Sequence, residues 1–571
     1  MKNVVFQGFD NKKICAILVI SDSFKHKGDV TMNTIYSFPQ PENEKVRQYA
    51  KGSEERAAIE KELKNIANLV FEVPVIIDGN PVYTDNIMEI TAPHDNKKVI
   101  ARVHMAGEKE INDAIKSSLK AKENWMRLPC DHRAAIFNRA AQLLSEKYRY
   151  IINAATMVCQ SKTVYQAEID SACELIDFLR FNTYFMSGIY SQQPNRTVSS
   201  VNRMEYRPVE GVILAIAPFN FTAIGGNLCT SPALMGNTVL WKPSEYAIIS
   251  SYIFMQILTE AGLPAGVINF LPCEGPNLTD IAVKSGKLGG IHFTGSTGVF
   301  NTIWRQVAQG IDKLEEYPRM VGETGGKDFL FAHTSCDRKA LITALIRGAF
   351  EYQGQKCSAC SRAYIPQSVY DEIKDELIEK TENIKMGSPE DFSNFMTAVI
   401  HRRSFENIKG YIDRASASDD AEIIAGGKYD DSKGWFIRPT IIKAKTADYE
   451  SMVNEIFGPV LTIYVYKDDE MDKTLKLCSE TSPYALTGSI FANDRFVIEK
   501  MLKALTYSAG NIYINDKTTG AVVGQQPFGG GRKSGTNDKA GSQLNLMRWV
   551  TARTITENYH PATEYEYPFM K

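Results

Sequence analysis

Short apolar runs alternate with longer helical stretches through the middle of the chain. Four such runs lie between residues 207 and 322, at 212–216, 238–241, 267–271 and 290–293. Helical stretches, including 247–261, separate several of them. Continuous apolar runs bounded by helices are typical of strands that are buried on both faces. We therefore predict a parallel sheet with helices on both sides in this region.

The same alternation returns after Gly326. The second set of strand-like runs lies at 328–332, 361–365, 460–466 and 487–491. Two α/β domains in series are the simplest interpretation. Upstream of both sets, charged segments with apolar residues at helical spacing predict helices at 54–65, 108–122 and 132–147.

Three segments fit neither domain. Two of them are 187–206 and 538–571, and the second contains a strand candidate at 549–555. The third, 1–31, is expected to be an N-terminal extension, and its apolar run at 14–20 is too short to cross a bilayer and predicts a buried strand. Acidic residues at Asp10, Asp22 and Asp29 disfavour a mitochondrial presequence.

Composition narrows the class of protein. A chain of 571 residues is too long for one core. A net charge of −2 gives no support for a nucleic-acid surface or a polybasic membrane anchor, so neither kind of partner is expected. Ten cysteines without framework spacing favour a reducing compartment, the cytoplasm, or the mitochondrial matrix if the source is eukaryotic.

Candidate chemistry centres on Cys357, in Gly-Gln-Lys-Cys-Ser-Ala-Cys at 354–360, 34 residues after Glu323. A thiolate can attack an electrophilic carbon, and a carboxylate can later activate water. Asn220, in Ala-Pro-Phe-Asn-Phe at 217–221, is a candidate oxyanion donor. Simpler interpretations exist for each residue: a turn at Asn220, and a surface carboxylate at Glu323. Cys357 and Cys360 could form a redox pair or half of a zinc site, although no second ligand pair completes a zinc site.

Two further motifs are typical of a nucleotide site. The turn Thr-Gly-Ser-Thr-Gly at 294–298 follows a strand and precedes a helix, whose free N–H groups suit a phosphate. It is not a G-x-G-x-x-G motif, and a tight turn without a ligand matches equally well. Trp-Lys-Pro-Ser-Glu at 241–245 ends a strand and directs Lys242 and Glu245 into a crevice, unless they form a solvated surface pair.

With Asn-Glu-Ile-Phe-Gly-Pro at 454–459, these stretches resemble the aldehyde dehydrogenase superfamily. Phe300 stands where many of its members have a second glycine. The resemblance implies two Rossmann-like parallel-sheet domains and a small oligomerisation flap, assembled as a homodimer or a larger oligomer of dimers. The NAD-binding domain with its helical arm would comprise 32–186 and 207–322, the catalytic domain 323–537, and the flap 187–206 and 538–571.

The stretch 519–538 resembles one branch, the 1-pyrroline-5-carboxylate dehydrogenases. That resemblance implies oxidation of L-glutamate 5-semialdehyde to L-glutamate with NAD, through a cysteine thiohemiacetal and a thioester. The implied catalytic residues are Cys357, Glu323 and Asn220. The implied cofactor residues are Ala217, Pro218, Phe219, Lys242, Ser244, Glu245, Thr294, Gly295, Ser296, Glu455 and Phe457. The implied substrate residues are Ser358, Gly520, Ala521, Phe528, Phe221 and Glu174, with no metal ligand.

Alternatives remain open at this stage. A related dehydrogenase for another short carboxylated aldehyde, such as succinate semialdehyde, shares most of these motifs. A cofactor-free cysteine hydrolase would need a histidine near Cys357, and His292, His333 and His401 lie in no recognisable hydrolase motif. For Glu174, a helix-surface carboxylate is nearly as good an interpretation. At Glu245, a carboxylate would favour NAD over NADP.

Overall fold

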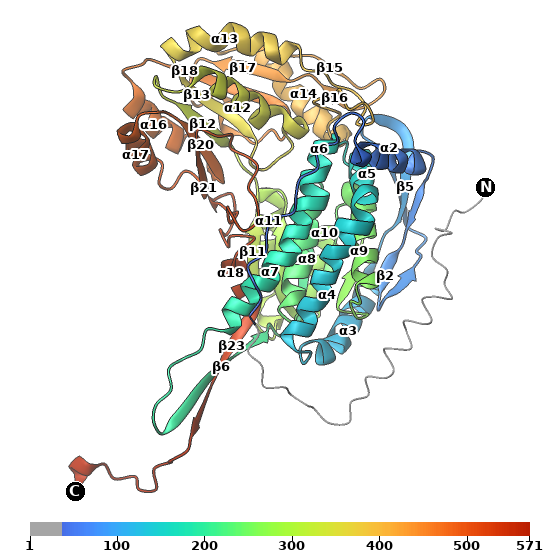
Figure 1. Cartoon of the computed structure of the whole chain (residues 1–571), viewed down its shortest axis with the longest axis vertical. Helices are drawn as coiled ribbons and strands as arrows, with labels where there is room; N and C mark the ends of the chain where they lie inside the picture. Colours follow the sequence, from blue (N-terminus) through green and yellow to red (C-terminus); the bar gives the residue numbers. More distant parts are fainter. Residues whose placement is uncertain (1–36) are drawn as a thin grey trace.

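The structure is a computed structural model that describes residues 37–571 (Figure 1). The extension at 1–31 and the strand expected at 14–20 lie outside the described residues. Within 37–571, no helix has the length and apolar character needed to span a bilayer.

A seven-stranded sheet organises the first domain, in the order β11-β10-β7-β8-β9-β2-β3. Five strands run parallel, namely β7 (Val212–Ile216), β8 (Val239–Lys242), β9 (Ile268–Phe270), β10 (Leu288–Thr294) and β11 (Arg319–Glu323). Two short antiparallel strands, β2 (Val75–Ile77) and β3 (Asn80–Val82), extend one edge. The four strands predicted between 207 and 322 are confirmed.

Helices cover both faces of this sheet, as predicted (Figure 1). On one face Ile213 and Ala215 share a core with α4 (Cys130–Leu143), α5 (Arg149–Cys159), α7 (Leu175–Tyr190), α8 (Thr222–Leu234) and α9 (Ile248–Glu260). On the other, Leu214 and Leu240 pack with α3 (Glu108–Trp125), α10 (Gly275–Lys284) and α11 (Thr297–Gln309). Successive residues of one strand therefore enter opposite cores, which explains the uninterrupted apolar run.

A second seven-stranded sheet forms the upper part of Figure 1, in the order β14-β17-β18-β13-β12-β20-β21. All its strands are parallel except β14 (Ala421–Ala425), and they are β17 (Thr440–Ala444), β18 (Val460–Tyr466), β13 (Cys360–Pro366), β12 (Asp328–Ala332), β20 (Thr487–Phe491) and β21 (Asn511–Ile514). One face packs on α12 (Arg338–Phe350) and α13 (Gln367–Glu382), and the other on α16 (Met471–Glu480) and α17 (Arg495–Ala504).

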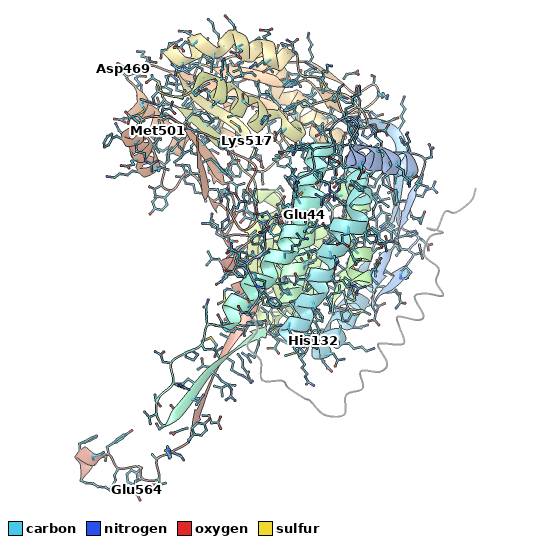
Figure 2. All side chains as sticks on the ribbon, in the orientation of Figure 1. Glu44, His132, Asp469, Met501, Lys517 and Glu564 are labelled. Carbon is cyan, nitrogen blue, oxygen red and sulfur yellow. The ribbon has the colours of Figure 1, made fainter. Side chains whose placement is uncertain are left out.

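A two-stranded ribbon projects from the body of the molecule (Figure 1). It pairs β6 (Ser200–Pro208) antiparallel with β23 (Val550–Asn558). Glu564 lies beyond it in the C-terminal tail (Figure 2). The projecting part is smaller than the two segments expected to form a flap, because α7 continues to Tyr190 and α18 (Gln543–Met547) packs against α7.

The N-terminal part adds elements that the apolar pattern does not reveal. The predicted helices appear as α2 (Glu54–Ile66), α3 and α4. Between α2 and α3, however, β1 (Phe71–Val73), β4 (Ile87–Ala92) and β5 (Asp95–His104) form a separate three-stranded sheet. A π-helical turn, Glu168–Glu174, links the short α6 (Val164–Ala167) to α7. Such turns occur often at functional sites.

Candidate active site

Cys357 lies on a strained loop between α12 and β13. Tyr352, Gln353 and Gly354 all adopt left-handed backbone angles, with φ of 51°, 55° and 65°. This conformation is costly for residues with a side chain and persists only where the surroundings impose it. The Gln353 amide imposes it here, because it accepts a hydrogen bond from the N–H of Thr397 at 3.0 Å and donates one to the carbonyl of Ala398 at 2.8 Å.

Asn220 is brought against this loop from the other domain. It follows β7 and is almost fully buried. Its Nδ2 donates a hydrogen bond to the Gln355 carbonyl at 3.1 Å, two residues before the cysteine. The fold therefore unites two motifs that are separated by more than a hundred residues, and it puts a side-chain amide donor beside the nucleophile loop.

Glu323 is the last residue of β11 and lies at the same junction. Burial raises the pKa of its carboxyl group well above the usual value, and Asp538 raises it further, whereas Lys539 and the Gly530 N–H lower it. Its Oε2 is buried and has no hydrogen-bond partner within the described chain. The surface-carboxylate interpretation of Glu323 is therefore wrong.

The surroundings of Cys357 raise the pKa of its thiol. Desolvation raises its pKa well above the ordinary value, and the carboxyl groups of Asp328, Glu323, Glu455 and Glu174 raise it further. Lys356 does not offset them, because its Nζ points to Glu351 Oε2 at 3.2 Å. Burial and the nearby carboxyl groups therefore oppose formation of the Cys357 thiolate.

Glu174 is partly buried instead of lying on an exposed helix surface. It ends the π-helical turn, and no hydrogen-bond partner for its carboxyl group exists among residues 37–571. Burial raises its pKa to about 8, and Lys162 and Lys356 are the cations that act on it. Its charge also acts on Cys357, so it belongs to the same pocket as the nucleophile.

Lys162 and Asp170 form a buried ion pair in the wall of this pocket, at 2.6 Å. Asp170 also accepts the N–H groups of Thr222 and Ala223, at 3.1 and 2.8 Å, and so caps the N-terminus of α8. The Lys162 ammonium lies 4.2 Å from the centre of the Phe221 ring. Sequence analysis missed the pair, since neither residue lies in a recognisable motif.

The loop expected to bind a substrate carboxylate is tied directly to the nucleophile loop. Ser358 Oγ lies 2.9 Å from Thr519 Oγ1, and Thr518 Oγ1 donates to the Ser358 carbonyl at 2.7 Å. Gly520 has φ of 105°, a conformation that favours glycine. Nearby, Lys517 lies where the second domain faces the helices of the first (Figure 2). Phe528 is held at the same edge by a two-way backbone bridge to Ala540.

Lys242 and Glu245 lie in a crevice at the carboxyl end of β8. Their charged atoms are 2.7 Å apart, and the side chains keep only 10% and 19% of their surface exposed. The pair exists, but the interpretation as a solvated surface pair is wrong. Ala217 lies alongside, with its N–H bonded to the Lys242 carbonyl at 3.0 Å, and Pro218 and Phe219 follow it. Ser244 begins the next turn by accepting from the N–H of Tyr246.

The turn after β10 leaves open space at the N-terminus of α11. Thr294 ends the strand, Gly295 donates to the Glu323 carbonyl at 3.1 Å, and Ser296 caps the helix. A side chain built on Gly298 would meet no atom within 4 Å. Phe300 is directed inward, where it stacks on Phe293 at 5.3 Å and covers Gly322. Its bulk therefore fills core space instead of blocking the helix N-terminus.

Glu455 and Phe457 complete the crevice from the second domain. The Glu455 carboxylate accepts the N–H of Gly326 at 2.9 Å, and burial raises its pKa to about 7. Phe457, with φ of 58°, meets Phe219 edge to face at 5.7 Å. Phe457 and Phe219 therefore bring the predicted cofactor residues of the two domains together, while a Glu455 oxygen is turned toward backbone.

The three histidines considered for the hydrolase alternative make their contacts away from Cys357. His401 Nδ1 accepts the N–H of Ser404 at 2.9 Å, and its ring packs against Tyr246. Buried His292 contacts the Leu228 carbonyl and Trp549, and His333 contacts Ser335. None of these three contacts Cys357, so the dyad required by the hydrolase alternative is not formed.

Comparison with known proteins agrees with this geometry. The sequence profile of the aldehyde dehydrogenase family matches residues 82–555. A mitochondrial delta-1-pyrroline-5-carboxylate dehydrogenase from Dictyostelium discoideum is 52% identical over 94% of this chain and 96% of its own, and the human mitochondrial enzyme of that name is 46% identical over 93% and 94%.

A solved structure shows the same architecture. The crystal structure of the Delta-pyrroline-5-carboxylate dehydrogenase from Mycobacterium tuberculosis bound with NAD is 46% identical and superimposes with a TM-score of 0.91. The match covers 95% of this chain and all of that one. With the shared fold and the assembled cysteine, asparagine and glutamate, the chain belongs to the aldehyde dehydrogenase family.

Proposed function

We propose that this chain oxidises L-glutamate 5-semialdehyde, the open form of 1-pyrroline-5-carboxylate, to L-glutamate with NAD. One observation carries the choice of substrate within the family. The loop that presents the N–H groups of Gly520 and Ala521 is bonded to the residue after the nucleophile, through Ser358 and Thr519. A carboxylate held there would be a fixed distance from Cys357. This arrangement, together with relatives named for the same reaction, supports the proposal.

Each catalytic residue has a defined task in this reaction. Cys357 attacks the aldehyde carbon as a thiolate, after its thiol proton has passed to solvent, and the resulting oxyanion accepts hydrogen bonds from Asn220 Nδ2 and the Cys357 N–H. NAD, held by the residues of the crevice, would supply the acceptor for the hydride lost from that carbon. Glu323 then takes a proton from the water that attacks the thioester. Burial raises the pKa of Glu323, so its ionised form is a stronger base than an exposed carboxylate.

The crevice fits NAD. The first N–H groups of α11, which begins at Thr297, would donate to a pyrophosphate, and Gly298 leaves room for a ligand beside this turn. Lys242 and Glu245 suit a ribose, and Glu245 would repel a 2′-phosphate, which favours NAD over NADP. Glu455 and Phe457 would lie at the nicotinamide end. Ala217, Pro218, Phe219, Ser244, Thr294, Gly295 and Ser296 would line the rest.

The pocket around Cys357 also has groups that suit the amino-acid end of the substrate. Ser358, Gly520 and Ala521 would donate to the α-carboxylate, and Glu174 would face the ammonium group. Phe221 and Phe528 would clamp the aliphatic chain. A narrow apolar slot with one anion site and one acid selects a short amino-acid aldehyde.

Assembly and location follow from the same resemblance. The division into an NAD-binding domain, a catalytic domain and a flap remains as set out from the sequence, with β6 and β23 as the flap. The tail after β23 exposes Tyr565, Tyr567 and Phe569, with at least 64% of each surface accessible. A second copy of the chain would cover them in a homodimer or an oligomer of dimers. In a eukaryotic source the enzyme would act in mitochondria, like its named relatives.

A substrate panel tests the function. NADH formation is followed at one pH with 1-pyrroline-5-carboxylate, succinate semialdehyde and butanal, each with NAD or NADP. The highest kcat/KM is expected for 1-pyrroline-5-carboxylate with NAD. A higher value for succinate semialdehyde would establish the other branch, and no NADH with any aldehyde would exclude a dehydrogenase.

A further inference from the structure

Lys539 lies behind Glu323 and ties three separate segments together. Its Nζ donates hydrogen bonds to the carbonyl of Gly510 at 2.8 Å, to the carbonyl of Gly529 at 2.9 Å and to Oδ1 of Asn511 at 3.1 Å. Asn511 Oδ1 also accepts the N–H of Gly529, at 3.3 Å. One ammonium group therefore fixes both the carbonyl and, through Asn511, the amide of Gly529.

Gly529 and Gly530 form the cradle in which the Glu323 carboxylate rests. A Cβ atom built on Gly529 would lie 2.8 Å from Glu323 Oε1, so the carboxylate occupies space that only glycine leaves free. The Gly530 N–H approaches the same carboxylate from the next residue. The position of Glu323 thus depends on the two glycines, and their position depends on Lys539.

We propose that Lys539 is a positioning residue for Glu323, which it serves by holding the glycine cradle and by supplying the positive charge that faces the carboxylate. This role rests on the proposed function, in which Glu323 is the base for thioester hydrolysis. The titratable groups that face Glu323 are Lys539, Asp538 and the thiol of Cys357. Asp538 is itself paired with Arg548 at 3.2 Å.

Lys539 and Asp538 shift the pKa of Glu323 in opposite directions. Burial raises its pKa, Asp538 raises it further, and Lys539 lowers it. Removal of the Lys539 charge should therefore keep the proton on Glu323 to higher pH, whereas removal of the Asp538 charge should release it at lower pH. At a pH below the pKa of Glu323, the ionised fraction of the base falls about tenfold for each pH unit that separates the two.

Rapid-mix kinetics of the full-length enzyme with NAD and 1-pyrroline-5-carboxylate test the role. In Lys539→Met, the NADH burst should keep its rate within about twofold, while steady-state turnover at pH 7 should fall about tenfold and its midpoint should move up by about one pH unit. Lys539→Arg should recover most of the loss. Asp538→Asn should move the midpoint down. Lys533→Met, at an exposed lysine of the same loop, should match wild type.

Distinct results would overturn the role. A Lys539→Met profile that superimposes on wild type would do so, and so would an equal slowing of burst and turnover, which would indicate a general defect of the site. If Lys539→Met does not fold, Asp538→Asn decides, since an unchanged midpoint contradicts the charge pairing and a lowered one supports it. Wild-type enzyme that forms no NADH would instead refute the proposed function, and Lys539 would then have no base to position.

Discussion

The cofactor crevice and the chemical centre lie side by side, but they are built in different ways. The crevice lies at the carboxyl ends of β7, β8 and β10, which are neighbours in one parallel sheet. Its charged groups already have partners, as in the Lys242–Glu245 pair at 2.7 Å. Such an edge is a general binding place in α/β folds and needs little beyond regular structure.

The chemical centre is assembled from residues that are distant in sequence, and some of their polar groups lack hydrogen-bond partners. Glu323 has a buried oxygen without a partner among the residues described, and Glu174 has no hydrogen-bond partner there. Three consecutive left-handed residues precede Cys357. Raised pKa values and backbone strain in one place are typical of catalytic sites. The comparison indicates that charged groups are paired in the crevice and left without hydrogen-bond partners in the centre.

Replacement of the nucleophile should abolish catalysis at the chemical centre and leave NAD binding in the crevice unchanged. Cys357→Ala should lower NADH formation at least about a thousand-fold, because no other group can form the covalent intermediate. NAD affinity, measured by calorimetry, should stay within about twofold of wild type, because the predicted nucleotide contacts do not include the thiol. The matched variant is Cys360→Ala, whose Sγ is buried and lies 3.8 Å from the Arg362 carbonyl. Equal losses in the two variants would mean that the cysteines act as a pair.

The same contrast explains what the sequence could predict. The strands of both sheets follow from their apolar runs, and the crevice residues follow because the strand ends of a parallel sheet converge. The roles of Lys162, Asp170 and Lys539 were not predicted from the sequence. Each acts through contacts across more than one segment, and no local pattern marks such contacts. The left-handed turn at Tyr352 and Gln353 also has no sequence signal, since neither residue type favours that conformation.

Blocking a backbone donor should weaken recognition of the substrate carboxylate without affecting the reaction at the aldehyde. Ala521→Pro removes one N–H and should lower kcat/KM for glutamate semialdehyde about ten- to a hundredfold, the effect of one charge-assisted hydrogen bond. Butanal lacks the carboxylate and should be unaffected. Ala521→Gly keeps the N–H and serves as the control. Equal losses on both aldehydes would indicate a distorted loop, and an unchanged preference in a folded variant would contradict the anchor.

A charge change in the crevice should alter cofactor choice without altering the chemistry. Glu245→Gln removes the carboxylate that faces a 2′-phosphate and frees Lys242 from its 2.7 Å partner. The ratio of kcat/KM for NADP to that for NAD should rise about twofold to fivefold, which is the size expected of one charge pair near the surface. The preference among aldehydes should not change. A ratio equal to that of wild type would place Glu245 away from the ribose.

The smallest effect should appear in stability, and it should grow as the pH rises from 4.5 to about 8. Burial raises the pKa of Glu174 from 4.5 to about 8, so the folded protein binds this proton more tightly than the unfolded chain does. The resulting stability is complete below pH 4.5 and is lost as the pH rises through 8. Glu174→Gln has no proton to lose, so its Tm without ligands should match wild type at pH 5 and exceed it by about 1–3 °C at pH 9. Glu564→Gln, in the exposed tail, should show no such trend. A Tm difference that is constant across this range would mean that Glu174 is solvated, and it would remove one of the acids that distinguish the chemical centre from the crevice.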